Sequence, residues 1–200
     1  MQLYLKKPVG LKPLYSRGLV DLSMELHIRP EYLYKQMFRL RQLDTPRMER
    51  LWNTYAKSPK KLSHGVRLLR KRNGFGAPEE FYEGVELNES WEKDFKPLPE
   101  DASLTPIQLI MILDLYFRLT PITMVATTPE VVELGKLIRV EPQKIADIMD
   151  IYQFCDPYLN RADMMIDPLL GPCQEMWQRY GNANPEKLSA LAAQLKDYFL

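Results

Sequence analysis

Apolar side chains recur at helical spacing in two stretches of this chain. One stretch follows Thr105 and the other follows Asn184. Side chains three and four residues apart lie on one face of an α-helix. The first face consists of Ile107, Ile110, Met111, Leu113 and Phe117, with Asp114 as a polar break, and the second of Leu188, Leu191, Ala192, Leu195 and Phe199. We therefore expect an amphipathic helix over 106–119 and a second helix after Pro185.

Five prolines mark expected helix starts, because each follows a residue whose side chain can cap a helix. At the first helical position proline loses no intrahelical hydrogen bond, and the preceding side-chain oxygen can accept one from a backbone N–H. These starts are Thr45-Pro46, Ser58-Pro59, Thr105-Pro106, Thr128-Pro129 and Asn184-Pro185. The best strand signal is the alternation of Met1, Leu3 and Leu5 with Gln2 and Tyr4, which favours a short N-terminal β arm. The pattern as a whole predicts an all-α fold.

The chain contains an internal repeat. Residues 19–44 align onto residues 131–156 without a gap, at a constant offset of 112. Identical residues at this offset are Val20, Leu22, Pro30, Met37 and Asp44 with Val132, Leu134, Pro142, Met149 and Asp156. A second block, ERLWNTYAKSPKKLS from Glu49, matches QEMWQRYGNANPEKLS from Gln174 with one extra residue. Such self-similarity predicts two tandem helical repeats, of which only the second has a long helix ahead of the matching blocks.

Each repeat contains a pattern that resembles a helix-turn-helix pair. A small residue stands where the two helices approach, Ser23 in the first repeat and Gly135 in the second. The turn position where glycine is commonest is held by His27 in the first repeat and by Arg139 in the second. The remaining positions of the pattern are Leu22, Leu26, Ile28, Pro30 and Leu33 in the first repeat, and Leu134, Ile138, Val140, Pro142, Ile145 and Ile148 in the second. Because the same spacing occurs in helical bundles that never touch DNA, the surface chemistry must decide what the pair does.

Charge is distributed unevenly along the chain, although the formal net charge is only +1. Residues 1–72 carry 17 Lys and Arg against 5 Asp and Glu, whereas residues 73–200 carry 10 against 21. Residues 73–103 alone hold nine acidic residues and two lysines, together with the aromatic residues Phe75, Phe81, Tyr82, Trp91 and Phe95. We therefore expect a basic helical repeat over 1–72, an acidic linker over 73–103, and a helical repeat with an extra N-terminal helix over 104–200.

The basic repeat offers two groups of candidate DNA-binding residues. Donors on lysine, arginine, glutamine and tyrosine side chains suit phosphate oxygens and base edges. On the second helix of the pair, Tyr32, Lys35, Gln36 and Arg39 are spaced to share one face, with Arg29 and Arg41 flanking it, and Lys60, Lys61, Arg67 and Arg70 crowd the helix after Ser58. The corresponding face of the second repeat has Lys144, Asp147 and Asp150, which would repel a phosphate backbone. A solvated helix face is the alternative interpretation of both basic groups.

The second repeat resembles the N-terminal module of bacterial HNH-type endonucleases. The resemblance covers about 80 residues and lies in the stretches LTPIQLIMILDLYFRLTP, TPEVVELGKLIRVEPQKIADIMDIYQFCDP and QEMWQRY. In that family the module precedes a nuclease domain and is thought to help engage DNA. The family's Gly-Arg-Thr-Pro-like turn is replaced here by residues 139–142, and by residues 27–30 in the first repeat. The resemblance implies DNA association without cleavage, because His27 and His64 have no partners in an HNH metal pattern.

The sequence offers little material for catalysis. Cys155 and Cys173 form no CxxC pair, the carboxylates lack metal-ligand spacing, and no glycine-rich phosphate loop occurs. We therefore expect no enzymatic activity, no cofactor and no metal. The aromatic residues shared by both repeats, which we expect to pack in the core, are Trp52, Tyr55, Trp177 and Tyr180. The chain has neither a signal-peptide pattern nor an apolar run of roughly 18 residues, so we expect no membrane contact and a cytoplasmic location.

These observations favour a non-enzymatic DNA-binding protein with a regulatory role, in which the first repeat contacts duplex DNA. The second repeat would then supply protein contacts or self-association. The alternative is a protein-interaction or scaffold module, in which the acidic linker or the second repeat docks on the basic repeat. In that alternative the aromatic residues of the linker provide apolar area for docking, and its carboxylates take the place of phosphates.

Overall fold

The structure is a computed structural model that describes residues 1–6, 10, 13–76, 90–159, 161, 165–182 and 184–200. All the regular secondary-structure elements among these residues are helices, which confirms the predicted all-α fold. The chain divides into two compact units, Met1–Trp91 (unit 1) and Glu92–Leu200 (unit 2). The division falls inside the stretch expected to be a linker. None of the described helices has the length and apolarity needed to cross a membrane.

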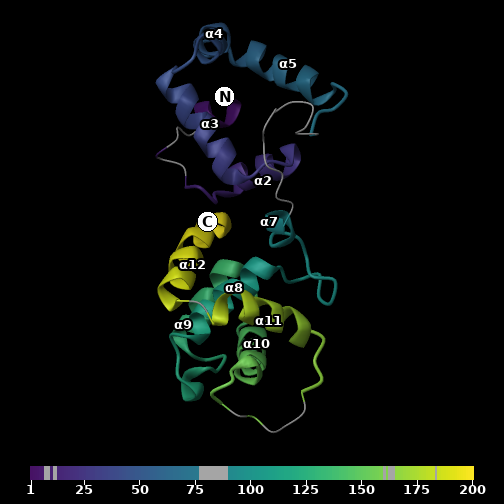
Figure 1. Ribbon diagram of the computed structural model, residues 1–200, viewed down its shortest axis with the longest axis vertical. Helices are drawn as coiled ribbons and strands as arrows, with labels where there is room; N and C mark the ends of the chain where they lie inside the picture. The colour runs from purple at the N-terminus through teal and green to yellow at the C-terminus, as the bar shows by residue number, and fades with distance from the viewer. Residues whose placement is uncertain (7–9, 11–12, 77–89, 160, 162–164, 183) are drawn as a thin grey trace. The chain divides into compact units, whose positions relative to one another are not determined.

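In its described residues, unit 1 has five helices that pack around a small apolar core. They are α1 (Gln2–Lys6), α2 (Arg17–Leu26), α3 (Pro30–Gln42), α4 (Pro46–Tyr55) and α5 (Pro59–Arg70). Figure 1 shows α3, α4 and α5 framing the N-terminal helix. The core consists of Tyr4, Leu19, Met37 and Leu40, and Trp52 packs against it from α4.

The expected N-terminal β arm is wrong, because Gln2–Lys6 is helical. The alternation of Met1, Leu3 and Leu5 would place these residues on one side of a strand and Tyr4 on the other. In the structure it is Tyr4 that enters the core, with its ring edge-on to Trp52 at a centroid distance of 6.1 Å. A contact between residues 48 positions apart therefore overrides the local strand signal.

Unit 2 is arranged around one buried helix. Its elements are α8 (Pro106–Tyr116), η1 (Pro121–Thr123), α9 (Pro129–Ile138), α10 (Pro142–Cys155), α11 (Leu170–Met176), the π-helical turn η2 (Trp177–Gly181) and α12 (Pro185–Phe199), and the short α7 (Ser90–Lys93) lies at the division. α8 packs against α9, α10, α11 and α12 (Figure 1).

The prediction of an amphipathic helix over 106–119 is wrong in two respects. The helix ends at Tyr116, and all eleven of its residues are buried rather than one face of it. A helix that is buried on every side is apolar on every side. The two polar residues of α8 make hydrogen bonds or ion pairs: Gln108 donates to the Ile138 carbonyl at 2.9 Å, and Asp114 pairs with Arg118 at 2.9 Å.

The predicted helix starts are confirmed. The helices α4, α5, α8, α9 and α12 begin at the five expected prolines, and α3 and α10 begin at Pro30 and Pro142. Two of the capping side chains accept the expected bond: Thr45 from the N–H of Met48 at 3.2 Å, and Asn184 from the N–H of Glu186 at 2.8 Å. Local sequence therefore places these helices correctly.

The pairs α2–α3 and α9–α10 turn in the same way at positions 112 residues apart. His27 and Arg139 both adopt left-handed backbone conformations, with φ of 52° and 59°. In each pair the next residue donates its N–H to the carbonyl of the small residue, over 3.1 Å to Ser23 and 3.0 Å to Gly135. A Cβ on Gly135 would lie 2.7 Å from the carbonyl oxygen of Val140, which explains the glycine there.

The described part of the acidic linker is divided between the two units. Residues 92–103 belong to unit 2, where Phe95 is buried and meets Tyr198 edge-on at 5.1 Å. The carboxylate of Asp94 accepts two bonds from Arg179, at 2.6 and 2.8 Å. Residues 73–76 belong to unit 1. Residues 77–89, with Phe81 and Tyr82, lie outside the described residues.

Candidate nucleic-acid interface

The face of α3 proposed to read DNA lies opposite the side that packs in the core. Met37 and Leu40 are buried, whereas Lys35 is exposed and Tyr32 and Arg39 are half-buried. Spacings of three and four residues bring these last three side chains, and the half-buried Gln36, to one side of the helix. Arg41 is not part of this face, because it follows Met37 by one helical turn.

Three of the candidate arginines are paired with carboxylates. Arg70 donates two hydrogen bonds to Glu25 at 2.6 and 2.9 Å, and this contact raises the pKa of its guanidinium. Arg39 pairs with Asp44 at 3.0 Å, and Arg29 with Glu31 at 3.4 Å. A phosphate therefore has to compete with a carboxylate for the N–H groups of these three arginines.

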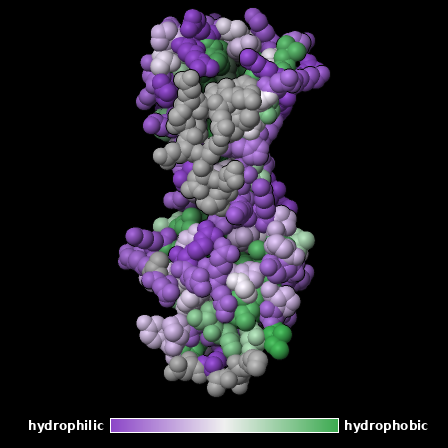
Figure 2. Space-filling view, turned by 45° about the vertical axis from the view of Figure 1, so that its right-hand side comes forward, coloured by the Kyte–Doolittle hydropathy of each residue, from purple (hydrophilic) through white to green (hydrophobic). Residues whose placement is uncertain are grey.

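The other candidate cations are Lys35, Arg41, Lys60, Lys61 and Arg67. All five are exposed, and none forms an ion pair with a residue in the described part of the chain. In Figure 2 hydrophilic side chains cover most of the visible surface of unit 1 outside the grey atoms. The charge of these five residues is therefore available to an approaching polyanion.

The exposed side of α5 carries a continuous basic stripe, which we call the α5 stripe. It consists of Lys60, His64, Arg67 and Lys71, spaced by three or four residues and all exposed. Leu62, which is buried, and Val66, which is half-buried, face the opposite side. Lys71 belongs to the basic run expected from the sequence, whereas His64 was not among the candidate residues, although its spacing from Lys60 and Arg67 was the available signal. Lys61 and Arg70 flank the stripe on either side.

The corresponding face of α10 in unit 2 is occupied by local ion pairs and hydrogen bonds. The ammonium of Lys144 contacts Asp101, and Asp150 pairs with Arg161 at 2.8 Å. Hydrogen bonds from Lys144 and Ser103 lower the pKa of Asp101 to about 2. The side-chain amide of Gln143 donates to Asp147 at 2.9 Å. Unit 2 therefore presents no cationic face on this helix.

The two tryptophans among the shared aromatic residues pack in or against the apolar cores. Trp177 is buried and lies edge-on to Tyr116 at a centroid distance of 5.7 Å. Trp52 is partly buried against the core of unit 1. The predicted role in packing is confirmed for these two tryptophans, whereas Tyr55 and Tyr180 are half-buried. Burial and a hydrogen bond to Asp156 at 2.9 Å raise the pKa of Tyr116 well above its usual range.

The cysteines lie in surroundings that suppress their reactivity. Burial raises the pKa of Cys155 to about 11 and that of Cys173 to about 12, so both thiols are protonated at neutral pH. A protonated thiol is a poor nucleophile and a poor metal ligand. Within the described ranges no group of three or more His, Cys, Asp or Glu side chains is placed to hold a metal ion.

No protein-family model, curated protein or solved structure matches this chain.

Proposed function

We propose that this protein is a non-enzymatic DNA-binding protein, in which unit 1 contacts duplex DNA through α3 and the α5 stripe. The observation that carries the proposal is the exposure of the unit 1 cations on helix faces turned away from the core. Exposed lysine and arginine side chains on an outward face can reach phosphate oxygens without any rearrangement of the fold. A regulatory role fits a protein that acts by occupying DNA.

The structure of the pair α2–α3 supports α3 as the helix that enters the major groove. A helix of this length fits that groove, and its outward face combines cationic and amide side chains that can reach base edges. Tyr32, Lys35 and Gln36 would make the base-edge and nearby phosphate contacts. The α5 stripe would add phosphate contacts that do not depend on sequence.

The alternative function, in which the acidic linker docks on the basic repeat, is less well supported than the sequence alone indicated. Glu92 pairs with Lys96, Asp94 with Arg179 and Asp101 with Lys144, all within unit 2. These three carboxylates are therefore committed to local partners. The glutamates of residues 77–89 lie outside the described residues, and their role in this alternative stays a prediction.

The proposal is tested by measuring the affinity of the full chain for duplex DNA at several salt concentrations. Cations that neutralise phosphates release counterions, so the affinity should fall linearly on a double-logarithmic plot, by about 0.9 in slope for each phosphate contacted. We expect a slope that corresponds to several contacts. Failure to bind duplex DNA even at low salt would remove the proposal.

A further inference from the structure

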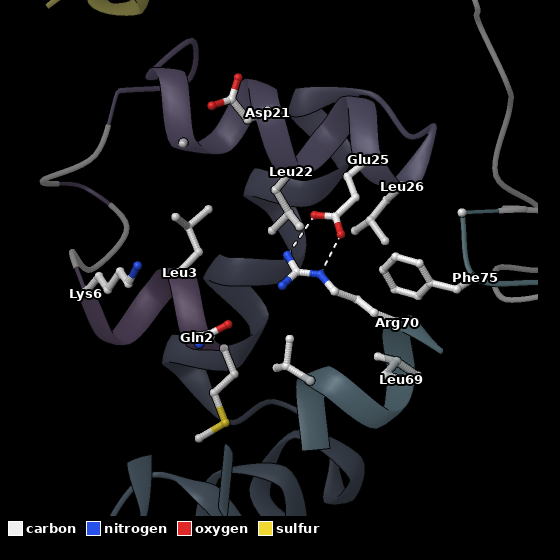
Figure 3. A pocket seen from close by; sticks show the side chains of 14 residues that line it. Gln2, Leu3, Lys6, Asp21, Leu22, Glu25, Leu26, Leu69, Arg70 and Phe75 are labelled. Carbon is white, nitrogen blue, oxygen red and sulfur yellow. Dashed lines mark hydrogen bonds and ion pairs between the residues drawn. The ribbon is translucent and has the colours of Figure 1, made fainter. Parts of the chain in front are cut away.

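Unit 1 contains a cavity of about 420 Å³ between α1, α2 and α5, lined by apolar side chains and also by the charged Lys6, Asp21, Glu25 and Arg70 (Figure 3). Its apolar walls are formed by Leu3 of α1, Leu22 and Leu26 of α2, and Val66 and Leu69 of α5. Figure 3 shows Arg70 and Glu25 joining α5 to α2 beside these side chains. Leu69 is 44% exposed, and Leu22, Leu26 and Val66 are half-buried.

The neighbouring helix α1 corresponds to the last turn of α8 in unit 2. Tyr4 and Tyr116 are 112 residues apart, which is the offset that relates residues 19–44 to 131–156. Each tyrosine meets the tryptophan of its own unit edge-on, at 6.1 Å for Trp52 and 5.7 Å for Trp177. The sequence LYLK around Tyr4 also parallels LYFR around Tyr116. α8 extends for ten residues before Tyr116, whereas α1 begins two residues before Tyr4.

The walls of the cavity correspond to residues that are buried in unit 2. At the offset of 112, Leu22 and Leu26 match Leu134 and Ile138. Alignment of the shared P-x-K-L-S motif matches Val66 and Leu69 with Ala192 and Leu195. All four residues of unit 2 are at most 8% exposed. The same positions are therefore covered in one unit and partly open in the other.

In unit 2 the beginning of α8 contacts one of these positions. α8 packs on both α9 and α12, which correspond to α2 and α5. Its Gln108 side chain donates to the carbonyl of Ile138, the residue that matches Leu26. In the part of unit 1 that the structure describes, no helix takes this place.

We propose that the cavity is a docking site for an apolar α-helix of a partner protein, which takes the place held in unit 2 by the first two turns of α8. The matching helix is Pro106–Leu113, with aliphatic side chains all around it. An occupant of the same kind presents aliphatic residues to Leu22, Leu26 and Leu69. It also carries an amide that can donate to the carbonyl of Leu26.

A second copy of this chain is a poorer occupant. The helix of this composition that it would have to supply is α8, which is buried on all sides in unit 2. Donating α8 to another molecule would therefore require unfolding its own unit. A separate protein with an exposed apolar helix can bind without unfolding any part of itself. This interaction is additional to the proposed DNA contact and does not depend on that contact.

The test uses a fluorescent peptide of residues 104–114, LTPIQLIMILD, as the probe of the cavity in the full-length chain. We expect saturable binding in fluorescence anisotropy, in the absence of DNA. Leu69→Asp should weaken this binding by about tenfold or more, because it places a charge on the apolar wall. The matched control is Leu68→Asp, since Leu68 is 58% exposed and does not line the cavity. It should leave the affinity unchanged.

Two further measurements make the result decisive. Circular dichroism should show that both variants fold, which the exposure of both leucines favours, and a probe with Ile110→Pro should not bind because it cannot form the helix. Absence of saturable binding to the unaltered chain, or equal loss with both variants, would overturn the proposal. Sedimentation of the unaltered chain as a dimer that Leu69→Asp converts to a monomer would also overturn it, in favour of a second copy as the occupant.

Discussion

The close approach of α9 and α10 depends on the missing side chain at Gly135. A Cβ there would lie 2.7 Å from a backbone oxygen, which cannot rotate away as the end of a side chain can. The matching position of unit 1 holds Ser23, which is completely buried. The two turns are therefore alike in backbone conformation but differ in the room they leave for a side chain.

We expect Gly135→Ala to lower the free energy of unfolding by about 1–3 kcal/mol, the usual cost of overpacking a tight contact. The matched control is Gly171→Ala in α11, where a Cβ would meet no atom within 4 Å. This second change should leave stability unchanged or raise it slightly, because alanine favours a helix. Urea unfolding followed by circular dichroism measures both variants. Equal effects would contradict the steric explanation.

Asp101 gives unit 2 a defined acid sensitivity. Hydrogen bonds from Lys144 and Ser103 lower its pKa from 3.8 to about 2 in the folded chain. A carboxylate with a lowered folded pKa contributes stability above the unfolded pKa and loses it as the pH falls through the folded one. The contribution of Asp101 is therefore complete at neutral pH and disappears between about pH 4 and pH 2.

We expect Asp101→Asn to lower the urea midpoint at pH 7 and to make that midpoint less sensitive to acid. The neighbouring Glu100 is exposed, and Glu100→Gln serves as the control that should change neither quantity. If the two variants lost stability in parallel between pH 7 and pH 2, the ion pair with Lys144 would not be the source of the acid sensitivity.

The helix α5 combines a packed inner side with the outer side that we propose contacts DNA. Its inner side buries Leu62, while the α5 stripe runs along its outer side. Cations in its last turn also interact favourably with the helix dipole, so the basic end of α5 needs no ligand to be stable. A substitution on the outer side of α5 can therefore test the proposed DNA binding without disturbing the packing of the helix.

We expect the double variant Lys60→Glu and Arg67→Glu to weaken DNA binding and to reduce the magnitude of the salt slope by about 2, because two phosphate contacts are lost. The control is the double variant Lys187→Glu and Lys196→Glu on α12, which changes the net charge equally at exposed positions of unit 2. Lys144 is unsuitable for this purpose, since it pairs with Asp101. Equal weakening by both variants would indicate a net-charge effect and not a binding face.

In the molecule as a whole, opposite charges are separated between the two units. Residues 1–72 hold the excess of lysine and arginine, and Asp94 and Asp101 at the start of unit 2 are paired within that unit. The expected domain limits of 72 and 104 differ from the compact units, which divide between Trp91 and Glu92. The difference arises because Phe95 and Leu98 are buried in unit 2, which a charge count does not detect.

Local signals along the chain predicted much of this fold. A helix start at proline depends only on the proline and on the capping residue before it. The starts at Thr45-Pro46 and Asn184-Pro185 could therefore be predicted from the local sequence. The repeated pattern placed His27 and Arg139 at the turn position where glycine is commonest, and the structure shows both in a left-handed conformation. Spacing along the sequence also predicted which candidate residues of α3 share one face, because spacing decides which side chains lie on the same side of a helix.

Contacts between distant residues decided the rest. The pairing of Arg70 with Glu25, 45 residues away, removed that arginine from the freely available cations. The burial of α8 on every side follows from four helices packed around it, and the helical form of Gln2–Lys6 follows from the contact of Tyr4 with Trp52. The amino-acid sequence set where helices begin, how they turn and which side chains share a face, because these depend on near neighbours. Only tertiary packing decided which faces are covered, and it left the cavity of unit 1 open where unit 2 holds a helix.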